Sequence, residues 1–320
     1  MAPMWKRLFG GVLAVASIQA AGVNAQYPNP GPVSGATTVH DPSVIKTSSG
    51  TYIMAHTGDN VALKTSTDRT VWREAGAVFP NGAPWTTPYT NGEKNLWAPD
   101  ISFHNNQYYL YYSASSFGTQ KSAIFLATSP TGASGSWTNQ GLVIESSASV
   151  DYNAIDPNLI VDASGKWWLS FGSFWSGIKM IRINPSTGKR SGTNLISLSR
   201  RSTNVDGAVE APYITRRGNY YYLWVAFDRC CAGASSTYRT MVGRSTSITG
   251  PYVDKSGVSM ANGGGTEVMA SHGSIYGPGH PAVFTDADAD VFVYHYYNSA
   301  GTALLGINLI RWESDWPVIY

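Results

Sequence analysis

The sequence predicts an all-β fold, a five-bladed β-propeller with about four antiparallel strands in each blade. Three observations lead to this prediction: a segment that recurs five times, a hairpin signal inside every copy, and the lack of any long run with helical periodicity. Radial repetition of four-stranded sheets leaves only short, protected strand edges. A β-helix or a pair of β-sandwiches is the alternative, but five units of this length with four strands each fit neither well.

The recurring segment begins with an X-Pro step and continues with a short apolar strand, a polar turn and an aromatic-rich strand. Its five copies span residues 40–56, 96–113, 154–172, 209–227 and 279–297, with prolines at Pro42, Pro99, Pro157, Pro212 and Pro281. In chain order the turns read SSG, HNNQ, ASG, RRGN and DADAD, and each separates two runs typical of strands. Further strand-like runs, such as SAIFLATS, follow the hairpins and complete about four strands per unit.

The residues at the X-Pro steps are expected to surround the central axis, if the strand after each proline is the innermost strand of its blade. These residues are Asp41, Trp97, Asp156, Glu210 and His280. In the first, third and fifth copies the side chain directly precedes the proline, and in the other two it stands one residue earlier, before Ala-Pro. Three carboxylates, an aromatic ring and an imidazole are therefore expected to converge on one face.

Carboxyl groups in this arrangement point to glycoside hydrolysis, in which one protonates the leaving oxygen and another activates water or attacks the sugar. A third carboxylate nearby raises the pKa of the acid by like-charge repulsion. Each Asp-Pro taken singly is better explained as a turn residue that bonds to its own backbone. Glu210 is harder to explain in this way, because Glu is a poor turn former and a buried, unpaired carboxylate is costly.

An ordered series of motifs carries a family resemblance over nearly the whole chain after residue 25. HDPSVI, NLWAPDI, YNAIDPNL, FGSFWSGI, VEAPYI and YGPGHPAVF resemble the endo-1,5-α-L-arabinanases of glycoside hydrolase family 43. The resemblance implies a five-bladed propeller enzyme that cuts the arabinan side chains of pectin with inversion. It also implies that Asp41 is the general base, that Glu210 is the general acid, and that Asp156 tunes and orients the acid.

The same resemblance implies a set of substrate-binding residues, in which the aromatic side chains stack on arabinofuranose rings and the others border the cleft or bond to hydroxyls. They are Trp97, Phe117, Gly118, Asn153, Ser173, Phe174 and Trp175. Each has a plainer explanation, namely core packing for the tryptophans and hairpin ends for Ser173 and Gly118. Without the resemblance, the plainer explanations would be preferred.

His280 lies in GPGHP, where glycines let the backbone approach a ligand closely. The resemblance implies a cation near the axis that is held by this histidine and otherwise by water, which suggests calcium. Calcium prefers oxygen ligands, so a site with one imidazole would be loose. The DADAD turn (286–290) resembles the start of an EF-hand loop but lacks its glycine and glutamate, and a solvated turn is expected there.

Residues 1–25 have the features of a secretory signal peptide: Lys6 and Arg7, a short apolar run, and a small residue at Ala25. Residues 26–320 would then be one secreted, extracellular catalytic domain, and we expect it to be a monomer. Removal of the first 25 residues leaves 20 basic against 20 acidic residues. This balance disfavours nucleic acid or an anionic membrane as a partner.

The composition suits an uncharged polysaccharide as the partner, since the chain has 11 Trp, 19 Tyr and 10 Phe but only 13% charged residues. A solvated β-rich surface explains the same composition equally well. The only cysteines, Cys230 and Cys231, are adjacent. They form either a bridge to each other, which secretion favours, or two buried thiols.

Two further functions remain possible from the sequence. A propeller lectin would bind sugar without cutting it, but lectin propellers tend to repeat one pocket, whereas here the five positions carry different groups. An exo-acting arabinofuranosidase or β-xylosidase would share the fold, and only the heights of the loops around the cleft would separate it from an endo-acting enzyme.

Overall fold

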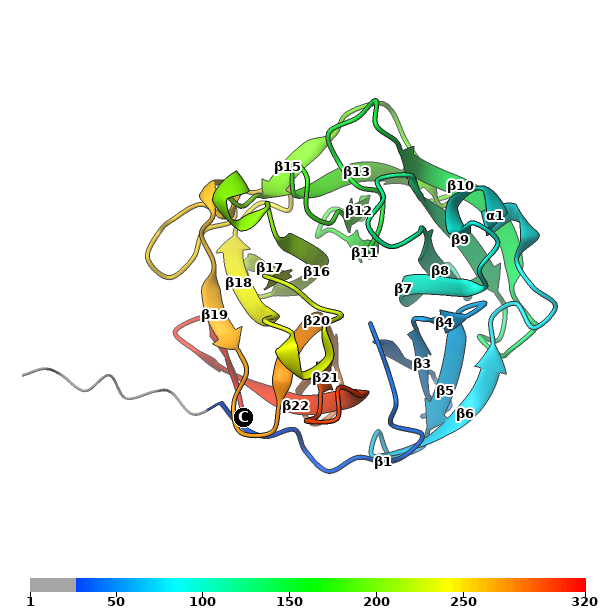
Figure 1. Cartoon of the computed structure of the whole chain (residues 1–320), viewed down its shortest axis with the longest axis horizontal. Helices are drawn as coiled ribbons and strands as arrows, with labels where there is room; N and C mark the ends of the chain where they lie inside the picture. The colour runs from blue at the N-terminus through cyan, green and yellow to red at the C-terminus, as the bar shows by residue number, and fades with distance from the viewer. Residues whose placement is uncertain (1–26) are drawn as a thin grey trace, which may run out of the picture.

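The computed structural model describes residues 27–320, which form five small sheets arranged in a ring around a common axis (Figure 1). The predicted five-bladed β-propeller is confirmed. The predicted signal peptide, residues 1–25, lies outside the described residues. Helical structure within 27–320 is limited to α1 (Thr87–Thr90) and four 3-10 turns, η1 (Pro84–Thr86), η2 (Thr203–Val205), η3 (Gly233–Ser235) and η4 (Met260–Asn262). None of these helices has the length and apolar composition needed to cross a bilayer.

The first three blades each contain a four-stranded antiparallel unit with short additions. Blade 1 comprises β1 (Ser34–Gly35), β2 (Ser43–Lys46), β3 (Tyr52–His56), β5 (Ala62–Ser66) and β6 (Val71–Ala77). Blade 2 comprises β4 (Gly58–Asp59), β7 (Asn95–His104), β8 (Gln107–Ala114), β9 (Ser122–Ser129) and β10 (Thr138–Ser146). Blade 3 comprises β11 (Asn158–Val161), β12 (Trp167–Phe171), β13 (Ile178–Asn184), β14 (Lys189–Arg190) and β15 (Ile196–Ser199).

The last two blades are simple four-stranded antiparallel sheets. Blade 4 comprises β16 (Val209–Arg217), β17 (Tyr220–Phe227), β18 (Arg239–Ser245) and β19 (Thr266–Met269). Blade 5 comprises β20 (Tyr276–Thr285), β21 (Asp290–Tyr297), β22 (Ala303–Glu313) and β23 (Trp316–Ile319). Each of the five predicted hairpins is present, as β2–β3, β7–β8, β11–β12, β16–β17 and β20–β21.

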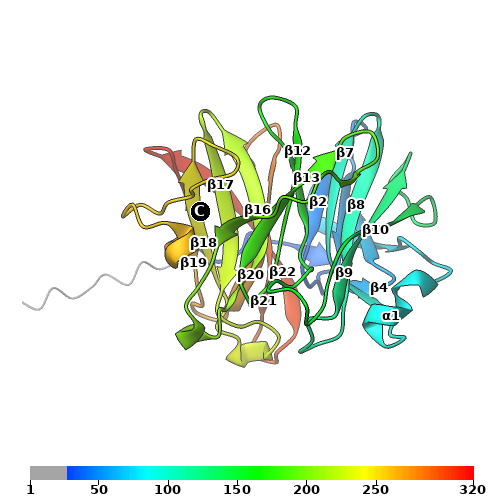
Figure 2. The same cartoon turned by 90° about the horizontal axis from the view of Figure 1, so that it is seen from above.

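The strand that follows each X-Pro step lies next to the axis, as the sequence predicts. The inner strands β2, β7, β11, β16 and β20 contact one another in that order, and β20 contacts β2 to close the ring. Seen from the side, several of these strands stand upright along the axis, and α1 lies at one end of the ring (Figure 2). The starts of these strands are therefore brought together.

The core consists of apolar layers between successive blades. Leu63 of blade 1 and Leu110 of blade 2 belong to the same apolar cluster. Similar clusters lie between blades 2 and 3, 3 and 4, and 4 and 5. The last cluster joins Val293 of blade 5 to Met54 of blade 1. Each middle strand is buried on both faces, which explains continuous apolar runs such as that of Tyr220–Phe227. Each large side chain buried in this way contributes about 1.5–3 kcal/mol, so the blades hold the inner strands firmly.

Besides the apolar layer between them, polar contacts and strand pairing also join the first and last blades. The N-terminal segment pairs with both, since β1 runs parallel to β6 while Thr38 bridges to Leu304 of β22. In the DADAD turn, Asp286 forms ion pairs with Lys46 (2.6 Å) and Arg69 (2.8 Å) of blade 1. The expectation of a solvated turn is wrong for Asp286, whose side chain is only 2% exposed. The turn is buried there because it packs against blade 1.

Candidate active site

The five residues before the recurring prolines share an unusual backbone conformation. Asp41, Ala98, Asp156, Ala211 and His280 have φ values of 51°, 43°, 58°, 53° and 54°. Positive φ is uncommon for residues other than glycine, although Asp and His adopt it more readily than most. In β7, β16 and β20 this residue falls at an irregularity in the pairing with the next strand. The repeated kink therefore fixes how the chain enters each inner strand beside the axis.

One pocket of about 1000 Å³ is lined by residues from these entry segments. It is lined by every site residue that the sequence singled out: Asp41, Trp97, Phe117, Gly118, Asn153, Asp156, Ser173, Phe174, Trp175, Glu210 and His280. These residues come from blades 1 to 5 and from the loops between their strands. The five different blade starts thus contribute to one asymmetric pocket and not to five similar ones.

Asp41 is surrounded by hydrogen-bond donors and imidazoles. Its Oδ2 accepts a hydrogen bond from Thr57 Oγ1 (2.6 Å) and lies 2.8 Å from Nδ1 of His40, while its Oδ1 lies 3.1 Å from Nδ1 of His280. Its own N–H donates to Nδ1 of His295 at 3.2 Å. Burial alone would raise the pKa of the Asp41 carboxyl, but the charges of His40 and His280 outweigh it and hold this pKa well below its usual range. Asp41 is therefore an ionised carboxylate at neutral pH.

Glu210 has the opposite electrostatic environment. The residue is only 8% exposed, and burial together with the negative charge of Asp41 raises its pKa. Two hydroxyl groups orient it, since Ser173 Oγ contacts Oε2 at 2.6 Å and the Tyr238 hydroxyl contacts Oε1. These two hydrogen bonds lower the pKa of Glu210 but do not cancel the effect of burial. Glu210 is thus suited to hold a proton where Asp41 is not.

Asp156 lies beside Glu210 and is connected to it through the backbone. Its Oδ2 accepts a hydrogen bond from the N–H of Ala211 at 3.0 Å, and its own N–H donates to Ser113 Oγ at 3.0 Å. Burial, followed by the charges of Glu210 and Asp41, raises the pKa of Asp156 well above its usual value. Two neighbouring buried carboxyls of this kind cannot both ionise easily, so the pair retains a proton.

The remaining predicted substrate-binding residues form the walls and rim of the pocket. Phe117 and Trp175 are 82% and 42% exposed, which is unusual for aromatic side chains and common in sugar-binding clefts, whereas Asn153 is buried and Trp97 is half-buried. Phe174 and Trp175 both have positive φ (53° and 42°). Gly207 permits this turn, because a Cβ at that position would lie 3.0 Å from the Trp175 carbonyl oxygen.

The surroundings of His280 permit only a loosely held cation. Its Nδ1 faces Asp41, so Nε2 is the atom left for a metal. The nearest cluster of possible ligand atoms among the described residues is His40, Asp41 and His295, which offers two imidazoles and one carboxylate. Calcium takes six to eight oxygen ligands, so water would have to supply most of them.

Sequence reasoning missed several residues that contact the carboxyls. His40 directly precedes Asp41, and its position in the first motif could have drawn attention to it. Tyr238 lies in the β17–β18 connection, outside the repeated segment, and His295 lies inside an aromatic strand that looks like core.

Of the two alternatives for the adjacent cysteines, the structure contains the Cys230–Cys231 disulfide, and both cysteines line the pocket.

A five-bladed propeller whose pocket brings three buried carboxyls together has the arrangement expected of a glycoside hydrolase. Residues 31–317 match the model of Glycosyl hydrolases family 43, and the chain belongs to that family.

Similar proteins have names that refer to arabinan. The chain is 45% identical over 286 residues to the extracellular endo-α-(1→5)-L-arabinanase 1 of Bacillus subtilis (strain 168), with 87% of each chain covered. Among solved structures, it resembles a GH43 endo-arabinanase from Bacillus licheniformis (46% identity, TM-score 0.84, 90% of this chain and 99% of that one). It also resembles an exo-1,5-α-L-arabinanase from a bovine ruminal metagenomic library (38% identity, TM-score 0.84, 90% and 99% covered).

Proposed function

We propose that this protein hydrolyses internal α-1,5-L-arabinofuranosidic linkages of arabinan by single displacement. The observation that carries the proposal is the contrast between two carboxyls in one pocket: Asp41 is held by donors and imidazoles, whereas Glu210 is buried beside Asp156. The names of the similar enzymes from two Bacillus species support arabinan as the substrate.

In the proposed mechanism Asp41 is the general base and Glu210 is the general acid. Asp41, as a carboxylate, accepts a proton from a water molecule, which attacks the anomeric carbon from the side opposite the leaving group. Glu210 donates its proton to the departing glycosidic oxygen. Asp41 precedes the inner strand of blade 1 and Glu210 lies at the start of the inner strand of blade 4, and both line the pocket that would hold the sugar and water.

Asp156 would act on Glu210 and not on the substrate. The two buried carboxyls repel each other when both are charged, so the pair keeps a proton that Glu210 can donate, and the hydrogen bond from the Ala211 N–H to Asp156 Oδ2 fixes the backbone next to the acid. Trp97, Phe117, Phe174 and Trp175 would stack on sugar rings, while Asn153, Ser173 and Gly118 would border the same subsites.

Exo-acting cleavage is the second candidate, because one structure of 38% identity is named an exo-1,5-α-L-arabinanase. Product analysis on linear arabinan separates the two functions. Endo-cleavage releases a ladder of oligosaccharides early, whereas exo-cleavage releases short products of one size from the start. A preparation of Glu210→Gln made in parallel shows whether the products come from this pocket, because they should then disappear.

We further propose that the enzyme is secreted and that His280 holds a largely hydrated calcium ion through Nε2. The first proposal rests on the signal-peptide features of residues 1–25 and on the extracellular relative from Bacillus subtilis. The second rests on the pocket-lining position of His280. A cation there would add positive charge near the axis, and no proton transfer in the scheme depends on it.

A further inference from the structure

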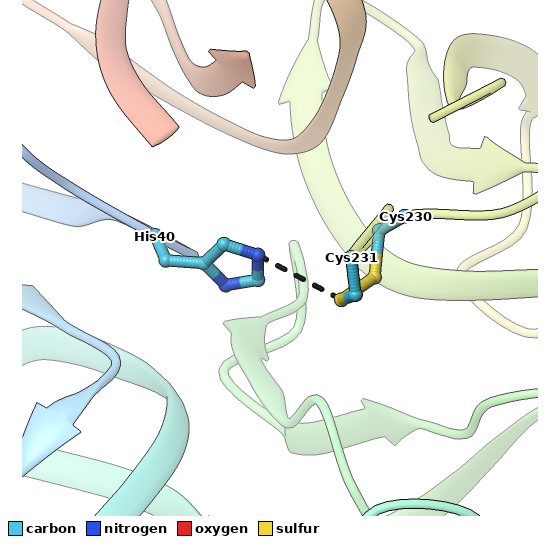
Figure 3. A group of neighbouring side chains, drawn as sticks. All are labelled: His40, Cys230 and Cys231. Carbon is cyan, nitrogen blue, oxygen red and sulfur yellow. Dashed lines mark hydrogen bonds between the residues drawn. A yellow bond between two sulfur atoms is a disulfide. The ribbon is translucent and has the colours of Figure 1, made fainter. Parts of the chain in front are cut away.

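The Cys230–Cys231 disulfide lies in the wall of the catalytic pocket but has no part in the mechanism above. It belongs to the loop 228–238 between β17 and β18. Cys231 is exposed and Cys230 is half-buried. Figure 3 shows the disulfide facing the imidazole of His40, whose Nε2 lies 3.8 Å from Cys231 Sγ.

One series of contacts leads from the disulfide to Asp41. The backbone N–H of Cys231 donates to the Tyr297 hydroxyl at 3.0 Å, and that hydroxyl lies 2.9 Å from Nε2 of His40. The other ring nitrogen of His40 lies 2.8 Å from Asp41 Oδ2. These contacts connect the Cys231 backbone, through the Tyr297 hydroxyl, to the imidazole of His40, which in turn contacts the carboxylate.

A second series of contacts leads from the disulfide to Glu210. Cys230 packs against the cluster formed by Ala211, Ala226 and Tyr238, in which Ala211 is the residue after Glu210. The hydroxyl of Tyr238 contacts Oε1 of Glu210, and the Tyr238 N–H donates to the carbonyl of Arg229 at 3.1 Å. The loop that contains the disulfide thus also places the hydroxyl that orients the acid.

The disulfide constrains the backbone of Cys231. Its φ is 67°, in the left-handed region that residues with a side chain rarely occupy. The disulfide closes a small covalent ring through the Cys230–Cys231 peptide bond and removes most of the rotational freedom of both residues. If the ring opens, we expect Cys231 to relax to a more common conformation and its N–H to turn away from Tyr297.

We propose that the Cys230–Cys231 disulfide is a positioning element for both catalytic carboxyls, so that opening it lowers turnover. The proposal rests on the proposed function, since it takes Asp41 and Glu210 as the base and the acid. The chain contains only these two cysteines, so a reductant has a single target in the protein. A water-soluble trialkyl phosphine reduces the S–S bond to two thiols and becomes the phosphine oxide, and water supplies its oxygen and the two thiol protons.

The test compares kcat and KM on linear arabinan for the oxidised enzyme, the phosphine-reduced enzyme and the reduced enzyme after reoxidation. Reduction should lower kcat by about tenfold, because small displacements of catalytic groups are costly, and should change KM much less. Reoxidation should restore kcat. Reduction should also move the alkaline limb of the profile of kcat against pH to higher pH. The reason is that the hydrogen bond from Tyr238 lowers the pKa of Glu210, so weakening this bond raises that pKa.

Two sets of variants separate positioning from general loss of structure. Cys230→Ser/Cys231→Ser should show the lower kcat without reductant and should not respond to the phosphine. Tyr297→Phe, which keeps the ring and removes the bridging hydroxyl, should lower kcat in the oxidised enzyme. Melting curves recorded with each assay show whether the assay temperature lies below every unfolding transition.

Equal kcat and an unmoved alkaline limb in the oxidised and reduced enzymes would overturn this inference alone. The inference also fails if the double serine variant has the kcat of the oxidised wild type. If the oxidised wild type does not cleave arabinan at all, the proposed function is wrong and the inference falls with it, so the two failures are distinguishable.

Discussion

Asp156 Oδ2 accepts a hydrogen bond from the backbone N–H of Ala211 at 3.0 Å, and Ala211 directly follows Glu210. This bond joins blade 3 to blade 4 at the position where the proposed acid enters the pocket. It gives Asp156 two separable effects on Glu210, one through its charge and one through the position of the backbone.

Asp156→Asn should separate these effects, because an amide oxygen can still accept the Ala211 N–H while the negative charge is lost. Repulsion between the two buried carboxyls makes the second proton of the pair harder to remove, so without the Asp156 carboxylate the alkaline limb of the kcat–pH profile should move to lower pH. Asp156→Ala loses the bond as well, and its kcat at the new optimum should be lower still. An alkaline limb that stays in place in Asp156→Asn would rule out the charge effect.

Glu210→Gln and Asp41→Asn should each lower kcat by about 10²–10⁴-fold, the usual contribution of a general acid or base. Both variants should remain folded, since each replacement is close in size to the original. Glu313→Gln, at an exposed position in β22, is the matched control and should retain full activity. Turnover near the wild-type rate in either pocket variant would remove that residue from its proposed role.

Tyr238→Phe tests the hydroxyl that contacts Glu210 Oε1. This hydrogen bond lowers the pKa of Glu210, so its loss should raise the pKa and move the alkaline limb of the kcat profile to higher pH. The limb should therefore move in the direction opposite to that in Asp156→Asn. We expect kcat at the optimum to fall about tenfold, as for the loss of one hydrogen bond to a catalytic group. A limb that moves to lower pH would contradict the account.

Removal of a bound cation should weaken the enzyme if His280 holds calcium. Dialysis against a chelator should lower the melting temperature or the rate, added calcium should restore it, and magnesium at the same concentration should do so less well. His280→Ala should reproduce the loss and abolish the response to calcium. If chelation and His280→Ala both leave the melting curve and the rate unchanged, His280 is not a metal ligand.

The fold was predictable because the repeat is visible in local chemistry. An X-Pro step, a polar turn and an aromatic strand recur at nearly constant spacing, and the structure places each of these strands beside the axis. Asp41, Asp156 and Glu210 could be found as candidates by the same reasoning, because they occupy matching positions in the repeat.

Other parts of the site depend on long-range packing that no local pattern records. Tyr238 reaches Glu210 only because the β17–β18 loop returns to the pocket, and His295 meets Asp41 from the second strand of blade 5. Asp286 resembled a solvated turn residue, since its partners Lys46 and Arg69 are more than 200 positions away in the chain. Closure of the ring between blades 5 and 1 creates the contacts of His295 and Asp286.

The stereochemistry of the first product tests the central claim, that Asp41 activates water and does not attack the sugar itself. A single displacement at an α-linked arabinofuranoside inverts the anomeric carbon. In a proton NMR time course of arabinan cleavage, we predict that the β-anomer of the new reducing end appears first and that the α-anomer follows by mutarotation. If the α-anomer appears first, or if a glycosyl adduct is trapped on Asp41, the assignment of Asp41 as a general base is wrong.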